Sequence, residues 1–412
     1  MILRATLFVL IAQLVANCAP QTEVNPEQAA IASAHPLATG AGFEILAQGG
    51  NAFDAAVAVA AALSVVEPYF SGLGGGSLFL LYRAQDRSEI FVDAREAAPD
   101  AASATMYLSP DGPVPRASLD GAKAAAIPGA PAALDWLTKR YGKLALRNNL
   151  APAIRYARGG FPVDQRYSKL TQSQQARLRD GAQNFLDQGK APEPGFILRQ
   201  PQLANTLRAI ASGGRDSFYR GAVAQELVRS VRARGGIWSI EDLAHYRVIE
   251  REPLKFRFRD LEITAAPLPS SAGIALAQSL HILEQFPLAN LPEAERAHLV
   301  VEAMRRAYED RADYMGASSA IPVERLLSEA YAKKRAATID KERATKSAEL
   351  ESFPREGEDT THFSIVDREG NRVAATLTIN TAFGSATVAG DTGVLLNNEM
   401  DDFSIAPGIP NA

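Results

Sequence analysis

The stretch that decides the fold is Asp359-Thr360-Thr361-His362-Phe363-Ser364-Ile365-Val366-Asp367, followed closely by residues 372–379. Apolar and polar side chains alternate in both segments, which is typical of half-buried β-strands. The turn Arg368-Glu369-Gly370-Asn371 between them predicts an antiparallel hairpin. Residues 350–359 are rich in charge and have no hydrophobic period, which predicts an exposed linker immediately before the first strand.

A strand that opens with threonine directly after an exposed linker suits one kind of chemistry. A threonine hydroxyl is a poor nucleophile at neutral pH and requires a nearby base. If the chain were cleaved between Asp359 and Thr360, the new α-amine of Thr360, with a pKa of about 7.7–8.0, would be that base. Taken alone the pattern is weak, because threonine is common at the start of any strand.

The chain before the linker is mainly helical by its periodicity. Residues 39–48 and 54–66 predict two helices, and the alanine-rich second one is expected to be buried. Residues 77–82 and 89–93 predict two strands around a polar turn. Further apolar faces with helical spacing occur at 131–141, 150–158, 201–211, 222–234, 274–284 and 297–315, and strand-like pieces at 254–258 and 262–266.

Composition excludes several classes of function. The 412 residues are 47% hydrophobic and 22% charged, as in ordinary globular proteins. Lysine and arginine number 43 against 47 acidic residues, so no nucleic-acid partner is expected. We expect no metal and no cofactor, because the histidines lack the spacing of metal ligands: His35, His245, His281, His298 and His362.

The N-terminus has the pattern of an export signal. Arg4 precedes a mostly apolar run at 7–16, which is too short to span a bilayer. We interpret residues 1–19 as a signal peptide and expect a periplasmic or secreted protein. Cys18 stands where bacterial lipoproteins carry their lipid, although Asn17 occupies a position at which those signals prefer a small residue. A lipid anchor at Cys18 and an incidental cysteine in a removed peptide both stay open.

Several motifs are spaced along the chain. They are Gly49 to Ala56, Gly72 to Gly76, Asp93-Ala94-Arg95-Glu96, Ile127-Pro128-Gly129, Pro269-Ser270-Ser271, Ala307 to Arg311, the 359–371 block, Thr378 to Gly384 and Leu395 to Phe403. In this order they resemble the γ-glutamyltranspeptidases, a family of N-terminal-nucleophile hydrolases. The resemblance extends from about His35 to the end of the chain.

The resemblance implies an α+β fold, specifically a four-layer αββα sandwich with strands 361–367 and 372–379 at its centre. It also implies that one precursor supplies a large-subunit region at 25–359 and the start of a small-subunit region at 360–412. The scissile bond would join Asp359 to Thr360, and Thr360 would be both the cleavage residue and the nucleophile.

By the same resemblance, further residues would serve the reaction. Thr378 would hydrogen-bond the nucleophile, and Arg95 would bind the α-carboxylate of the substrate, which suits its bidentate guanidinium. Asn380 would help to hold that end of the substrate. Glu399 and Asp402 would accept hydrogen bonds from the α-ammonium, so the expected substrate is a γ-glutamyl amide such as glutathione, with an amino acid, a peptide or water as acceptor.

Each assignment has a plainer interpretation. Arg95 would be a surface ion pair of little energetic weight, and Glu399 a solvated acid. Thr378 and Asn380 would be ordinary strand-end residues, and Asp402 would form a turn or a helix cap with Asp401.

Two other motifs do not predict sites. No lysine follows the glycines at 72–76, which argues against a phosphate-binding loop. Ser270-Ser271 lacks the Gly-x-Ser-x-Gly setting of a nucleophile and fits an N-cap of the next helix.

The segment after Thr360 is shorter than the small subunit of the family. Family members continue into a lid loop, a serine pair and a glycine pair that helps to form the oxyanion hole, so we expect part of the sheet to be missing here. Three hypotheses follow: a γ-glutamyl hydrolase or transferase, a related acylase of the glutaryl or cephalosporin type, and an inactive truncated homologue. Ala272, where the family usually has glycine, is a smaller departure.

Overall fold

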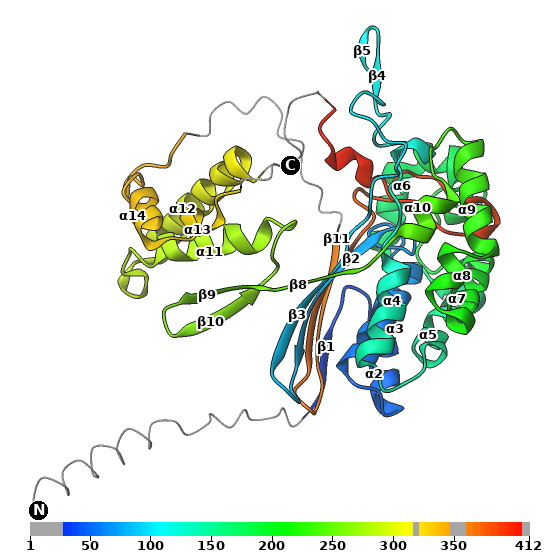
Figure 1. Cartoon of the computed structure of the whole chain (residues 1–412), viewed down its shortest axis with the longest axis horizontal. Coiled ribbons are helices and arrows are strands. Elements are labelled where there is room, and N and C mark those ends of the chain that lie inside the picture. Colours follow the sequence, from blue (N-terminus) through cyan, green and yellow to red (C-terminus); the bar gives the residue numbers. More distant parts are fainter. Residues whose placement is uncertain (1–27, 316–320, 347–359, 406–412) are drawn as a thin grey trace, which may run out of the picture.

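An antiparallel sheet of six strands lies at the centre of the computed structural model, which describes residues 28–315, 321–346 and 360–405 (Figure 1). The strands in spatial order are β1 (Ala30–Ala32), β11 (Thr360–Val366), β12 (Arg372–Thr378), β2 (Gly76–Arg83), β3 (Ser88–Ala94) and β8 (Ile249–Arg251). The hairpin β11–β12 therefore has β1 on one side and β2 on the other, both from the chain before residue 359.

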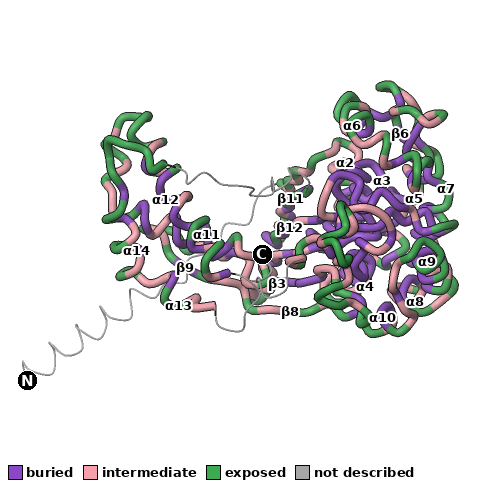
Figure 2. Tube along the Cα trace, turned by 90° about the horizontal axis from the view of Figure 1, so that it is seen from above, coloured by how far each residue is buried: buried purple, intermediate pink, exposed green. Residues whose placement is uncertain are grey.

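One face of the sheet is buried under helices. These are α2 (Pro36–Ala47), α3 (Ala52–Val66), α4 (Ala130–Tyr141) and α5 (Leu146–Gly159) (Figures 1 and 2). Every residue of α3 is buried, as its unbroken apolar sequence predicts. Burial alternates along β11 and β12, so Phe363 and Val373 pack toward these helices. The period of two in the sequence thus sets which face meets the core.

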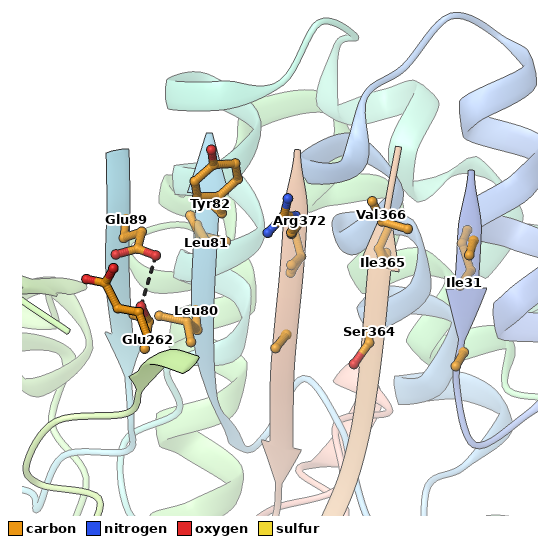
Figure 3. A pocket seen from close by; sticks show the side chains of 15 residues that line it. Ile31, Leu80, Leu81, Tyr82, Glu89, Glu262, Ser364, Ile365, Val366 and Arg372 are labelled. Atoms are coloured by element: carbon orange, nitrogen blue, oxygen red, sulfur yellow. Dashed lines mark hydrogen bonds between the residues drawn. The ribbon is translucent and has the colours of Figure 1, made fainter. Parts of the chain in front are cut away.

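The opposite face of the sheet is more open. Thr360, His362 and Ser364 alternate with the buried residues of β11 and are exposed. A hollow of about 560 Å³ lies over this face, and Leu80, Arg372 and neighbouring side chains line it (Figure 3). At its edge, the Thr264 hydroxyl donates a hydrogen bond to Glu89 at 2.9 Å, which ties the next group of elements to the sheet.

That group lies on the other side of the sheet from α2–α5 (Figures 1 and 2). It contains the hairpin of β9 (Leu254–Phe258) and β10 (Leu261–Ala265), and the helices α11 (Ala272–Leu283), α12 (Glu293–Tyr314), α13 (Val323–Leu326) and α14 (Glu329–Ala336). Small apolar clusters around Ile282 and Ile274 hold it together.

The remaining elements extend the main helical layer. Its helices are α6 (Gln165–Gly181), α7 (Pro201–Gly213), α8 (Arg215–Tyr219), α9 (Ala222–Ala233) and α10 (Ile240–His245). Short strand pairs accompany them: β4 (Leu108–Ser109) with β5 (Gly112–Pro113), and β6 (Phe161–Pro162) with β7 (Ile197–Leu198). Within the described ranges, no helix is long and apolar enough to cross a membrane.

The structure corrects several predicted boundaries. The first helix begins at Pro36 rather than at residue 39, because the His35 ring accepts a hydrogen bond from Leu37 N and caps it. Two later helices, α5 and α12, begin four residues earlier than the apolar faces at 150–158 and 297–315. The long helix α6 was not predicted, because its exposed sequence buries only Tyr167, Thr171 and Leu178.

Candidate active site

The predicted nucleophile lies at one end of the sheet, in a row that crosses four strands. Thr360 pairs with Thr378, and Thr378 pairs with Gly76. Ala94 pairs with Ser77, so Arg95 follows on the same row. Adjacent strands lie about 4.8 Å apart, which places the backbones of Thr360 and Arg95 roughly 14 Å from each other. One small molecule can therefore contact both side chains.

Thr378 is connected to the loop that follows β12. Its Oγ1 accepts a hydrogen bond from Asn380 N at 2.8 Å. Asn380 has a left-handed backbone with φ 70°, and its side-chain amide donates to Asn398 O at 2.9 Å. The structure thus brings Thr378 and Asn380 together at the strand end, as two parts of one hydrogen-bonded turn.

The glycines at 72–76 allow two chain segments to approach this turn closely. A Cβ on Gly75 would clash with Thr378 O, and one on Gly74 would clash with Leu395 O. Gly74 O also accepts a hydrogen bond from the Asn397 side chain at 2.6 Å. The glycines therefore serve close packing of the backbone.

Charged side chains gather beside the row. Arg95 forms ion pairs with both Glu399 and Asp402. The Arg95 and Asp402 side chains are 37% and 45% exposed, whereas that of Glu399 is 7% exposed. Glu399 and Asp402 belong to one short 3₁₀ turn, which presents both acids to the same guanidinium. The three residues predicted to read the α-carbon of the substrate thus converge in space.

Glu96 is a fourth member of this cluster, which the sequence interpretation did not assign. Burial raises the pKa of Glu96 to about 7, although the positive charge of Arg95 opposes the shift. Burial also raises the pKa of Glu399 well above its usual value, and the negative charge of Glu96 adds to that effect. Three acids share one arginine, so an added ammonium group would be stabilised there. The dipeptide Arg95-Glu96 within a predicted motif was the available indication.

Comparison with known proteins decides the family. The family model described as gamma-glutamyltranspeptidase matches residues 38–412. A glutathione hydrolase proenzyme of Pseudomonas sp. (strain A14) is 40% identical over 407 residues, covering 96% of this chain and 70% of that protein. The chain belongs to the γ-glutamyltranspeptidase family.

Solved structures of this family and of a related acylase share the fold. The γ-glutamyltranspeptidase of Helicobacter pylori has a TM-score of 0.72 and 34% identity, and the match covers 79% of this chain and 97% of that one. The cephalosporin acylase of Bacillus halodurans has a TM-score of 0.81 and 31% identity over 96% of this chain and 75% of that one. The predicted α+β sandwich class is confirmed, and the chain is an enzyme of the γ-glutamyltransferase and hydrolase type.

The remaining predictions for the γ-glutamyltranspeptidase site fall in three groups. Ser271 is the N-cap residue of α11 without a capping bond from its side chain, whereas the Ser270 hydroxyl accepts from Ala272 N at 3.3 Å. Among the described side chains, no cluster of three or more histidines, cysteines or acids is arranged to hold a metal ion. Cys18, the signal segment at 1–19 and Asp359 lie outside the described residues.

Proposed function

We propose that the protein hydrolyses or transfers the γ-glutamyl group of glutathione and other γ-glutamyl amides through an ester on Thr360. The convergence of Arg95, Glu399 and Asp402 at the sheet end that carries Thr360 is the observation that supports this proposal. The reaction requires prior cleavage of the chain between Asp359 and Thr360.

Recognition of the substrate follows from charge. The α-carbon of a γ-glutamyl group carries a carboxylate and an ammonium. Arg95 exchanges its partners for the α-carboxylate, to which a guanidinium donates two parallel hydrogen bonds. Glu399 and Asp402, released from Arg95, accept hydrogen bonds from the α-ammonium. The Asn380 amide assists at the carboxylate.

The chemical steps then use the freed N-terminus of Thr360. Its α-amine accepts the hydroxyl proton while Oγ1 attacks the γ-carbonyl carbon. The amide C–N bond breaks, the leaving amine receives the proton, and a γ-glutamyl ester remains on Thr360. Water or the amine of an acceptor amino acid or peptide attacks the ester, which releases glutamate or a new γ-glutamyl amide and restores the hydroxyl.

Similarity to a cephalosporin acylase supports a second candidate activity, the removal of glutaryl side chains. A glutaryl group has a terminal carboxylate but no ammonium. It would use Arg95 and leave Glu399 and Asp402 without a cationic partner. The three acids around Arg95 therefore favour the γ-glutamyl substrate over the glutaryl one.

One experiment tests the proposal and separates the alternatives. The purified protein is incubated, resolved on a denaturing gel and N-terminally sequenced, and its activity is measured with L-γ-glutamyl-4-nitroanilide and with glutaryl-4-nitroanilide. We expect a fragment that begins at Thr360 and a preference for the γ-glutamyl anilide. The Thr360→Ala variant should show neither the fragment nor the activity. An intact chain without activity would favour the inactive homologue, and preference for the glutaryl anilide would favour the acylase.

Export is part of the proposal, on the strength of the N-terminal segment. Fractionation of expressing cells should place the protein in the periplasm or the medium. Membrane retention that is lost in Cys18→Ala would support the lipid anchor.

A further inference from the structure

Arg177, on α6, uses every N–H group of its guanidinium. Nε donates to Asp120 Oδ1 at 2.6 Å, and Nη1 donates to Gln174 Oε1 at 2.8 Å and to Ala382 O at 3.1 Å. Nη2 donates to Gly384 O at 2.6 Å and to Leu119 O at 3.4 Å. The side chain is only 18% exposed. Such complete use of an arginine fork indicates a fixed position.

The loop that Arg177 holds directly follows Asn380 and has an unusual backbone. Asn380, Phe383 and Ala386 have φ values of 70°, 60° and 54°, which side-chain-bearing residues rarely adopt. Local strain of this kind persists only where the surroundings enforce it. The bonds from Arg177 to Ala382 O and Gly384 O are two such constraints in the middle of the loop.

A second path leads from Arg177 to the acidic turn. Leu119 O accepts hydrogen bonds from both Arg177 Nη2 and the Asn398 amide, the latter at 3.0 Å. Asn398 Oδ1 accepts from Thr381 N at 3.1 Å, and Asn398 O accepts from the Asn380 amide at 2.9 Å. Glu399 is the next residue in the chain. Hydrogen bonds therefore link Arg177 both to the loop beside Asn380 and to Asn398, which directly precedes Glu399.

We propose that Arg177 is a positioning residue for the γ-glutamyl pocket: it holds the loop 380–386 and, through Asn398, sets Asn380 and Glu399 for substrate binding. This inference rests on the proposed function and adds to it a residue that does not contact the substrate. The backbones of Thr360 and Thr378 are held by the β11–β12 pairing, and the only described bond from the loop to either side chain is that from Asn380 N to Thr378 Oγ1. Loss of the Arg177 hydrogen bonds should therefore weaken substrate binding more than it slows the chemical step.

Two substitutions test this positioning role of Arg177. Arg177→Met removes all the bonds, whereas Arg177→Lys keeps a charge for Asp120 but offers a single ammonium that cannot reach the separate carbonyls. We expect both to raise KM for L-γ-glutamyl-4-nitroanilide about tenfold or more, and to weaken inhibition by L-glutamate similarly. The kcat should change by less than about threefold, since a rise in KM alone reports lost uniform binding.

Arg179→Lys is the matched control, because Arg179 lies on the same helix, is exposed and donates to Gly189 O at 2.8 Å. Its KM should equal that of the unsubstituted protein. A normal KM in Arg177→Lys would overturn the proposal, even if the melting temperature falls, because a purely structural role predicts that result. If Arg177→Met does not fold, Arg177→Lys decides by the same criterion. An unsubstituted protein that leaves the anilide intact would instead count against the proposed function. Calorimetry with L-glutamate would then test the role of Arg177: weaker binding by Arg177→Lys supports it, and unchanged binding overturns it.

Discussion

Thr360 lies directly opposite Thr378 across the β11–β12 pair. The Thr378 hydroxyl accepts a hydrogen bond from Asn380 N, which leaves its own proton available to a neighbour. The strand register thus places a second hydroxyl beside the proposed nucleophile.

Thr378→Ala should slow both self-cleavage and turnover at least about tenfold, because it removes this hydroxyl and leaves Asn380 N without its acceptor. Thr378→Ser keeps the oxygen and should retain most of both activities. Fragment formation on gels and kcat with the γ-glutamyl anilide provide the measurements. Equal loss in the serine variant would show that the methyl group matters instead.

Arg95→Lys should raise KM for the γ-glutamyl anilide about 30- to 100-fold, since an ammonium cannot replace the paired bonds of a guanidinium to a carboxylate. Arg95→Ala should raise KM further, because it also leaves Glu399 buried beside other acids without a cation. Steady-state kinetics check the order. A lysine variant with unchanged KM would place the α-carboxylate elsewhere.

Binding of L-glutamate should strengthen as the pH rises from about 6 to about 8. Burial raises the pKa of Glu96 to about 7, so the acids around Arg95 gain negative charge across this interval and attract the α-ammonium more strongly. Calorimetric titration at several pH values measures the effect. In Glu96→Gln the dependence should become shallower, and a persistent steep slope would assign it to another group.

Gly75→Ala should destabilise the protein by about 2 kcal/mol or more, because the added methyl group would clash with Thr378 O and the neighbouring backbone would have to move. Gly40→Ala is the control: nothing lies within 4 Å of a Cβ there and Gly40 is inside α2, so a gain of about 0.5–1 kcal/mol is expected. Chemical denaturation gives both values. A neutral Gly75→Ala would mean that the loop relaxes freely.

Glu67→Gln should make stability less dependent on pH. The Glu67 side chain is fully buried 3.7 Å from Arg166, and burial raises its pKa, although Thr361 and Arg166 oppose the shift. Between the unfolded and the folded pKa of Glu67, the folded state therefore keeps a proton that the unfolded state has released. The free energy of unfolding consequently falls as the pH rises from about 4.5 through the folded pKa.

The glutamine variant cannot lose that proton, so its stability relative to the unsubstituted protein should be greater at pH 8 than at pH 5. Glu329→Gln, an exposed position paired with Lys333, should show little change. Denaturation curves at the two pH values provide the comparison. A loss of stability at pH 8 would mean that Arg166 compensates fully for the buried charge.

Much of the fold was predictable because apolar residues occur at the positions that each strand or helix buries. The hairpin of β11 and β12 was predicted from its alternating pattern and its turn, and the buried helix α3 from its alanine-rich apolar run. The same reasoning missed α6, whose helical conformation depends on an Asp164 cap and contacts of Tyr167 rather than on an apolar stripe.

The grouping of the candidate site residues was predictable where a sequence motif contains them. Arg95, Glu399 and Asp402 were expected to act together, and their side chains converge. The contribution of Arg177 was not predictable, because its acceptors are mainly main-chain carbonyls that carry no residue-type signature. Such contacts depend on how distant loops approach each other, which spacing along the chain does not show.

The position of β11 and β12 between β1 and β2 has a consequence for the processed protein. Each product of the proposed cleavage would contribute hydrogen bonds to a sheet that neither could complete alone. The two pieces should therefore denature together, and their reassembly from separated chains should be a second-order process whose rate depends on the concentration of both.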